Sequence, residues 1–210
     1  MIKAIIFDLD SCLAAANEVG DGLFAPAFQA IRTANNGHVP EDQLRSAFAD
    51  MWRFPFDFIA NKYKFSAEMR AAGFAVLRQI EVRQPMHGYG DLGVLAELPC
   101  KLFLVTSGFR RLQQSKVDAL NISHLFTEIH IDAIEEPNPK GKQPMMEAIL
   151  RTHGFAPSEV LIVGDNPDSE IAAGNRLGIT TIQTLRPGVH SSRAATYQIR
   201  NLEELKKIVK

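Results

Sequence analysis

Short runs of apolar residues recur along this chain, separated by stretches in which apolar residues return with a helical period. The first run, residues 1–7, is apolar at nearly every position, which is typical of a strand buried on both faces. Three further runs have this character and one shows it more weakly: residues 101–106, 159–163 and 179–182, and residues 127–131. The pattern predicts a sheet built from these strands.

Helical patterns lie between the later strands, over residues 109–120, 144–152 and 169–177. Gly154 and Gly178 stand where helix C-caps are expected. Strands that alternate with helices form right-handed βαβ units around a parallel sheet. We therefore predict an α/β fold, with a Rossmann-like three-layer parallel sheet as its core.

The region between the first and second predicted strands breaks this alternation. Its apolar residues follow a helical period over residues 26–34, 41–51 and 67–82, and it contains no convincing buried strand. We expect residues 16–85 to form an all-helical cap domain, with residues 1–15 and 86–210 forming the core domain. The aromatic cluster at residues 52–58 is expected to pack inside the cap.

Composition gives no support to several classes of protein. The 210 residues carry a formal net charge of −1, so nothing draws the chain toward nucleic acid or an anionic membrane. Cys12 and Cys100 are too few for a disulfide framework and lack metal-site spacing. No segment has the pattern of a signal peptide or a membrane span. We expect a cytoplasmic monomer or homodimer with no nucleic-acid or membrane partner.

Two acids, Asp8 and Asp10, stand where the first predicted strand ends. Ligands of open α/β sheets bind just beyond the carboxyl ends of the strands, so carboxylates at this point are well placed for chemistry. Asp is also a common turn former, and these two residues alone leave both interpretations open.

Other predicted strands end in polar residues as well. The second ends in Thr106-Ser107-Gly108 and the fourth in Gly164-Asp165, with further acids just beyond. The carboxyl ends of parallel strands share one edge, so these groups are expected to meet the first pair of acids there. Lys140 or Lys142, from the loop before a predicted helix, would join them. Complementary groups converging on one edge favour a catalytic site.

Four segments, in this order, resemble the four motifs of the haloacid dehalogenase-like hydrolase superfamily: FDLDSCL at residues 7–13, VTSG at 105–108, KGK at 140–142 and GDNPDSEI at 164–171. The helical insert resembles the C1-type cap of that superfamily. The resemblance implies a Mg²⁺-dependent phosphohydrolase that acts on a small phosphorylated metabolite through an aspartyl-phosphate intermediate.

The resemblance also implies roles for the acids. Asp8 would attack phosphorus, and Asp10 would protonate the leaving oxygen and then activate water. Residues i and i+2 of an extended strand face the same side, so both carboxylates can address one substrate. Mg²⁺ would be held by Asp8, Asp165 and a backbone carbonyl of Leu9 or Asp10, an oxygen-ligand site that suits phosphate chemistry.

The remaining motif residues would bind the phosphoryl group. Thr106 would donate a hydrogen bond to a phosphoryl oxygen, helped by the backbone near Ser107, and a helix N-cap at this point is compatible with that role. Counted back from Gly154, the short-loop form of the third motif selects Lys142 as the catalytic lysine, which we favour. A longer form of that motif would select Lys140 instead.

Some features leave alternatives open. The superfamily usually has Gly-Thr where this chain has Ser11-Cys12, which puts the fine positioning of the site in doubt. Asp168 and Glu170 would either act at the metal or serve as charges in a first helical turn. Contacts to the leaving group are expected among residues of the insert: Asn17, Glu18, Phe24, Trp52, Arg53 and Phe56.

Rival functions differ in what they require. A dehalogenase lacks the second acid of the first motif, so Asp10 argues against it. A phosphonate hydrolase needs a cap lysine, for which Lys62 and Lys64 are available. A phosphomutase shares every core residue, and a non-catalytic binding protein can share the fold. The sequence favours a phosphatase and leaves these alternatives open.

Overall fold

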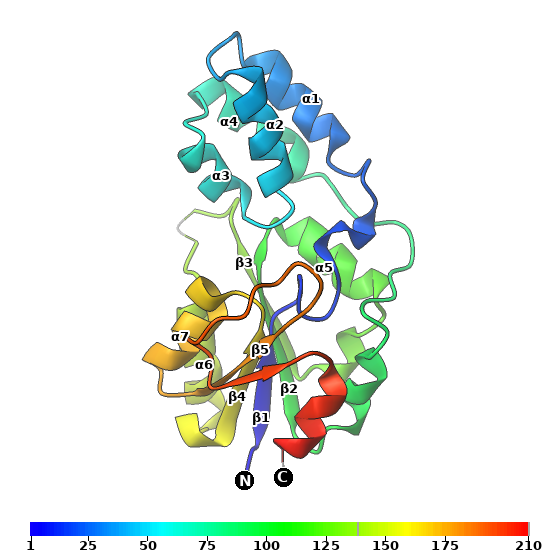
Figure 1. Ribbon diagram of the computed structural model, residues 1–210, viewed down its shortest axis with the longest axis vertical. Coiled ribbons are helices and arrows are strands. Elements are labelled where there is room, and N and C mark those ends of the chain that lie inside the picture. Colours follow the sequence, from blue (N-terminus) through cyan, green and yellow to red (C-terminus); the bar gives the residue numbers. More distant parts are fainter. Residues whose placement is uncertain (138, 210) are drawn as a thin grey trace.

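The computed structural model describes residues 1–137 and 139–209. Six parallel strands form one sheet in the order β3-β2-β1-β4-β5-β6, which confirms the predicted α/β class (Figure 1). The strands are β1 (Ala4–Phe7), β2 (Lys101–Gly108), β3 (Glu128–Ala133), β4 (Val160–Gly164), β5 (Thr180–Thr184) and β6 (Tyr197–Ile199). In the register of the sheet, Phe7 lies beside Leu104 of β2 and Val163 of β4. The residues that follow β1 therefore emerge at the centre of the sheet edge.

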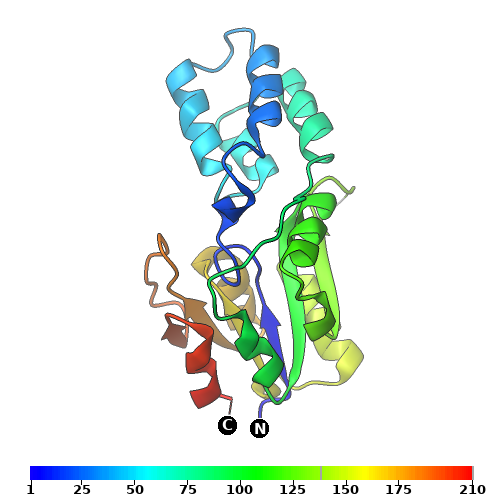
Figure 2. The same ribbon diagram turned by 90° about the vertical axis from the view of Figure 1, so that its right-hand side faces the viewer.

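Helices cover both faces of this sheet (Figures 1 and 2). The helices of the core are α5 (Arg110–Ala119), α6 (Lys142–His153) and α7 (Ala172–Arg176). Ile5 and Phe7 of β1 belong to the hydrophobic cluster that includes residues of α5. Ala4 and Ile6 belong to a second cluster, which includes residues of α6. Burial on both faces explains why this strand is apolar at successive positions.

The segment between β1 and β2 forms four helices at one end of the sheet (Figure 1). They are α1 (Ala25–Ala34), α2 (Glu41–Asp50), α3 (Phe56–Lys62) and α4 (Ala67–Leu77). The predicted helix over residues 67–82 is too long at its C-terminal end, because α4 ends at Leu77 and a turn over residues 78–79 follows it. Beyond that point the Val82 N–H donates to the Ser115 hydroxyl of α5, at 2.8 Å, which ties this linker to the core.

Aromatic packing joins the four-helix segment to the core. Phe56 is buried and packs against Phe74 of α4 with ring centroids 5.1 Å apart. Both rings lie near Phe109, which precedes α5 in the core, at 6.5 and 5.6 Å. Phe58, by contrast, is 48% exposed, so only part of the aromatic cluster at residues 52–58 fills a core.

Short helical turns complete the fold: η1 (Ala16–Val19), η2 (Leu92–Glu97), η3 (Ser123–Leu125), η4 (Pro157–Glu159), η5 (Pro167–Ile171) and η6 (Leu202–Lys207). Helix α3 and strand β6 were not predicted from the sequence. Both are short, with seven and three residues, and so carry little periodic signal. Within the described residues, no helix combines the length and apolar character needed to cross a bilayer.

Candidate active site

The chain turns back sharply after β1, and this turn presents the first two acids. The N–H groups of Cys12, Leu13 and Ala14 all donate to the Leu9 carbonyl, at 3.3, 2.9 and 3.2 Å. Ser11 adopts a left-handed backbone with φ of 58°. Glycine adopts this conformation without strain, which gives a physical reason for the glycine usual at this position of the motif. Serine holds the same turn at a cost of about 1 kcal/mol.

Lys142 lies between two buried carboxylates. Its ammonium Nζ is 2.7 Å from Asp8 Oδ1 and 2.9 Å from Glu170 Oε2. Burial by itself would lower the pKa of Lys142, but the charges of Asp8 and Glu170 outweigh it and raise that pKa. Lys142 is the first residue of α6, whereas Lys140 is exposed on the preceding loop. The structure thus brings Lys142 to Asp8 and leaves Lys140 at the surface.

Asp8, Asp165 and Glu170 form a compact carboxylate cluster. One oxygen from each lies within 4.8 Å of the others. Burial and the neighbouring carboxylates raise the pKa of Asp8 to about 7 and that of Asp165 to about 8, although Lys142 opposes both shifts. A divalent cation bound among these oxygens would relieve their repulsion, and an all-oxygen donor set is the kind that hard cations take. The cluster fits a divalent metal.

Glu170 therefore contacts the site directly, and the structure separates it from Asp168. Glu170 is buried, and its carboxylate also accepts the Asn166 N–H at 2.6 Å. A side chain on Gly164 would collide with Glu170, so glycine at the end of β4 leaves the space that Glu170 fills. Asp168 lies between Gly164 and Glu170 in the chain, and its side chain is exposed.

Asp10 is held apart from this cluster by two residues that the sequence analysis missed. Lys116 Nζ donates to both Asp10 oxygens, at 2.7 and 2.9 Å, and the Gln113 amide donates to Oδ2 at 3.0 Å. Burial alone would raise the pKa of Asp10, but Lys116 and Gln113 outweigh it and lower that pKa. The sequence held a signal for these two residues. Both fall on the apolar stripe of the predicted helix 109–120, where a polar side chain is buried and requires a polar partner.

Thr106 and Ser107 end β2 beside these groups. The Thr106 hydroxyl is buried and accepts a hydrogen bond from the Gln113 amide at 2.7 Å. The Ser107 hydroxyl donates to the buried carboxylate of Asp132 at 3.3 Å. Thr106 thus belongs to the network around Asp10, while the side chain of Ser107 is engaged with β3.

Cys12 is buried immediately behind the acids. Its thiol donates to the Val163 carbonyl at 3.6 Å, and burial raises its pKa well above the ordinary value, which disfavours a thiolate nucleophile. The Cys12 carbonyl accepts a hydrogen bond from Arg186 at 3.0 Å. Arg186 is itself buried, pairs with Asp91 at 2.8 Å and lies over the Tyr89 ring. Arg186 was not predicted, and it braces the turn that carries Asp10.

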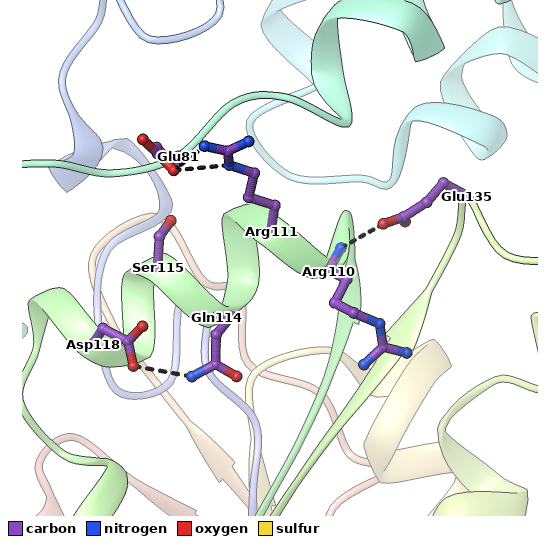
Figure 3. Close-up of a pocket in the computed structure, with 7 residues that line it drawn as sticks. All are labelled: Glu81, Arg110, Arg111, Gln114, Ser115, Asp118 and Glu135. Carbon is purple, nitrogen blue, oxygen red and sulfur yellow. Dashed lines mark hydrogen bonds and ion pairs between the residues drawn. The ribbon is translucent and has the colours of Figure 1, made fainter.

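A surface depression of about 470 Å³ lies on the other side of α5 and contains none of the motif residues (Figure 3). Its lining residues are Glu81, Arg110, Arg111, Gln114, Ser115, Asp118 and Glu135. The carboxylates here have partners: the Arg111 guanidinium reaches Glu81 at 2.5 Å, and the backbone N–H of Arg110 donates to Glu135 at 2.9 Å. This depression follows the seam between α5 and the linker after α4.

Comparisons with known proteins agree with this geometry. Residues 2–178 match the family of haloacid dehalogenase-like hydrolases. A glyceraldehyde 3-phosphate phosphatase from Methanopyrus kandleri is 29% identical over 202 residues, which cover 89% of this chain and 85% of that protein. Enolase-phosphatase E1 from a Sulfurihydrogenibium species is 34% identical over 90 residues, covering 41% of this chain and 37% of that protein. A phosphatase structure from Thermococcus onnurineus shares the fold, with a TM-score of 0.64, 20% identity and coverage of 99% and 98% of the two chains.

Proposed function

This chain belongs to the haloacid dehalogenase-like hydrolase family, and we propose that, as a phosphatase of that family, it hydrolyses a small phosphomonoester through an aspartyl-phosphate, with Mg²⁺ as cofactor. The observation that carries the proposal is that the two acids form ion pairs with two different lysines. Asp8 pairs with Lys142 at 2.7 Å, and Asp10, two residues on, pairs with Lys116 at 2.7 Å. One acid can then attack while the other moves a proton.

The first half-reaction transfers the phosphoryl group to the enzyme. An oxygen of Asp8 forms a bond to phosphorus as the bond from phosphorus to the leaving oxygen breaks. Because Lys116 and Gln113 lower the pKa of Asp10, its carboxylate takes up a proton when the substrate binds. The leaving oxygen then takes that proton from Asp10 and departs as the alcohol. We propose that Lys142 and the Thr106 hydroxyl hold the phosphoryl oxygens, whose negative charge has to be stabilised throughout this transfer.

The second half-reaction returns the enzyme to its starting state. A water molecule forms the new bond to phosphorus and gives a proton to Asp10, while the bond to the Asp8 oxygen breaks and inorganic phosphate leaves. Mg²⁺ held by Asp8, Asp165 and Glu170 would supply positive charge that lets the anionic phosphate approach these acids. Of the two backbone carbonyls proposed as a further ligand, that of Leu9 already accepts three N–H groups of the turn, so the Asp10 carbonyl is the one we propose.

Rival chemistries within the family have less support. A dehalogenase does not need a second acid such as Asp10. A phosphonate hydrolase needs an activated amine, but Lys62 is paired with Asp50 at 2.6 Å and its side chain is 47% exposed. For the substrate, the relative from Methanopyrus kandleri acts by its name on glyceraldehyde 3-phosphate. We therefore propose that small phosphorylated metabolites of this size come first in any screen.

The test is phosphate release with Mg²⁺ from p-nitrophenyl phosphate and from a panel of phosphorylated metabolites. We expect Asp8→Asn to lower kcat by more than about 10³-fold, because it removes the nucleophile. Chelation should abolish activity, and added Mg²⁺ should restore it. The exposed Asp168→Asn is the matched control and should retain activity. Activity that survives in Asp8→Asn, or the absence of activity on every phosphoester, would refute the proposal.

A further inference from the structure

We propose that Lys116 and Gln113 are positioning residues that hold the carboxylate of Asp10 where it exchanges a proton with the leaving group and with water. This inference rests on the proposed function, because it assigns Asp10 the proton transfers of the phosphatase reaction. Neither residue belongs to the four motifs, and both lie on the face of α5 that is turned toward the end of β1.

Lys116 is unusual because it is a buried lysine. Lysine is among the residues least often buried, because removing its charge from water costs several kcal/mol unless an anion is at hand. Lys116 is only 4% exposed, and its ammonium reaches both oxygens of Asp10, at 2.7 and 2.9 Å. Two contacts to one carboxylate fix its orientation as well as its position.

Gln113 links Asp10 to Thr106, the residue that would bind the phosphoryl group. Its amide nitrogen lies 3.0 Å from Asp10 Oδ2, 2.7 Å from the Thr106 hydroxyl and 3.1 Å from the Ser107 carbonyl. When the amide donates to Thr106, the hydroxyl proton stays free to donate to a phosphoryl oxygen. Gly108 allows this approach, since a side chain there would come within 3.1 Å of Gln113.

The two lysines therefore pair with different acids. Lys142 forms ion pairs with Asp8 and Glu170 inside the carboxylate cluster, and Lys116 forms an ion pair with Asp10 outside it. Without Lys116, the Asp10 carboxylate would lose both contacts that fix its orientation. A carboxylate that is free to turn is poorly placed to exchange a proton with the leaving oxygen.

The inference predicts a dependence on the leaving group. p-Nitrophenolate is a stable anion that departs without a proton, whereas an alkoxide needs one. We expect Lys116→Met to lower kcat on an alkyl phosphate by about 10²-fold, the usual size of an acid/base contribution, with KM changed less than about threefold. With p-nitrophenyl phosphate, the first turnover should keep its rate and appear as a burst of nitrophenolate, followed by slow turnover because water activation is impaired. A uniform loss on both substrates, burst included, would overturn the inference.

A double-mutant cycle provides a second readout. If Lys116 acts through Asp10, then Lys116→Met added to Asp10→Asn should cost less than about threefold further in kcat, whereas independent residues would give additive losses in free energy. Additive losses would overturn the inference. Lys116→Arg keeps the charge and should recover part of the activity on the alkyl phosphate.

Gln113→Leu gives an independent test if Lys116→Met does not fold. It should also show a burst with p-nitrophenyl phosphate, but a slower one, because Thr106 loses its donor as well. Its neighbour Gln114→Leu is the matched control, because Gln114 is exposed and bonds only to Asp118 on the same helix in the part of the chain described. It should retain wild-type kinetics on both substrates. A wild-type protein inactive on every phosphoester would refute the proposed function itself, which is a different outcome from an active enzyme that shows no burst in these variants.

Discussion

The acids at the ends of β1 and β4 differ in their electrostatic partners. Asp8 and Glu170 share Lys142, and Asp10 has Lys116 to itself. Asp165 has no ion pair among the described residues, and burial raises its pKa to about 8. The site therefore holds more carboxylate than its two lysines neutralise, which is the charge balance expected of a cation site.

This imbalance predicts how the stability of the metal-free protein depends on pH. Asp8 and Asp165 have raised pKa values of about 7 and about 8 in the folded state, above the unfolded value near 3.8. The folded protein thus binds more protons than the unfolded chain between these values, and its stability falls as pH rises from about 4 to about 8. We expect Tm without metal to be lower at pH 8.5 than at pH 6 by at least about 3 °C, the shift typical of 1 kcal/mol in a chain of this size.

Thermal unfolding in chelator checks this prediction, with Asp165→Asn as the comparison. Removing one of the two titrating acids should reduce the pH-dependent difference in Tm. Adding Mg²⁺ should raise Tm more at pH 8.5 than at pH 6, because the cation binds the ionised carboxylates. An identical pH dependence in the wild type and in Asp165→Asn would contradict the explanation.

At the scale of elements, close packing decides how the helices of the insert meet. Gly73 lies in α4 at the point where the Phe56 ring from α3 approaches, and the ring occupies the space that a side chain would need. Phe56 has little room to withdraw, because it is buried and packs against Phe65 and Phe74. The missing side chain is what allows α4 to approach α3 closely.

Gly73→Ala should therefore destabilise the protein, by about 1–3 kcal/mol, the usual cost of adding a methyl group to a packed core. The measurement is urea unfolding, with Gly93→Ala as the matched control. Gly93 has open space around the position of a new methyl group, and its φ is not positive. That substitution should leave stability unchanged or slightly increased. A neutral Gly73→Ala would mean that the helices rearrange freely.

At the scale of the whole molecule, the four-helix segment is connected to the core by two linkers that are bound to each other. Glu18, in the first linker, accepts hydrogen bonds from the backbone N–H groups of His87 and Gly88 in the second. The second linker is also fastened to α5 through the Glu81–Arg111 ion pair in the depression of Figure 3. Glu18 was considered for a leaving-group contact, and the structure instead places its carboxylate between the linkers.

Glu18→Ala should loosen this junction. We expect the amide protons of His87 and Gly88 to exchange at least about tenfold faster, because their acceptor is removed. We also expect KM to rise severalfold while Tm changes little. Asp21→Ala is the control, since Asp21 is exposed in the same linker. Unchanged exchange at both amides would show that Glu18 does not hold the linkers together.

Much of the fold could be predicted because its signals are local. The apolar runs predicted β1 to β5, and helical periodicity predicted α1, α2 and α5 to within two residues at each end. Helix α3 was missed because its seven residues make only about two turns, too few to establish a helical period. Strand β6 has only three residues, two of them exposed, so no apolar alternation marks it.

The candidate site, too, could be predicted only in part. The sequence by itself determined that acids, hydroxyls and a lysine would meet at one sheet edge, because strand order along the chain and the parallel direction of the strands dictate which ends converge. Only the tertiary structure decided that Lys142 rather than Lys140 reaches Asp8, that Glu170 joins the carboxylate cluster, and that Asp10 has its own lysine. Lys116 and Asp10 are 106 residues apart in the chain. Periodicity reports whether a side chain faces inward, but which charge it meets there depends on how helix and strand pack.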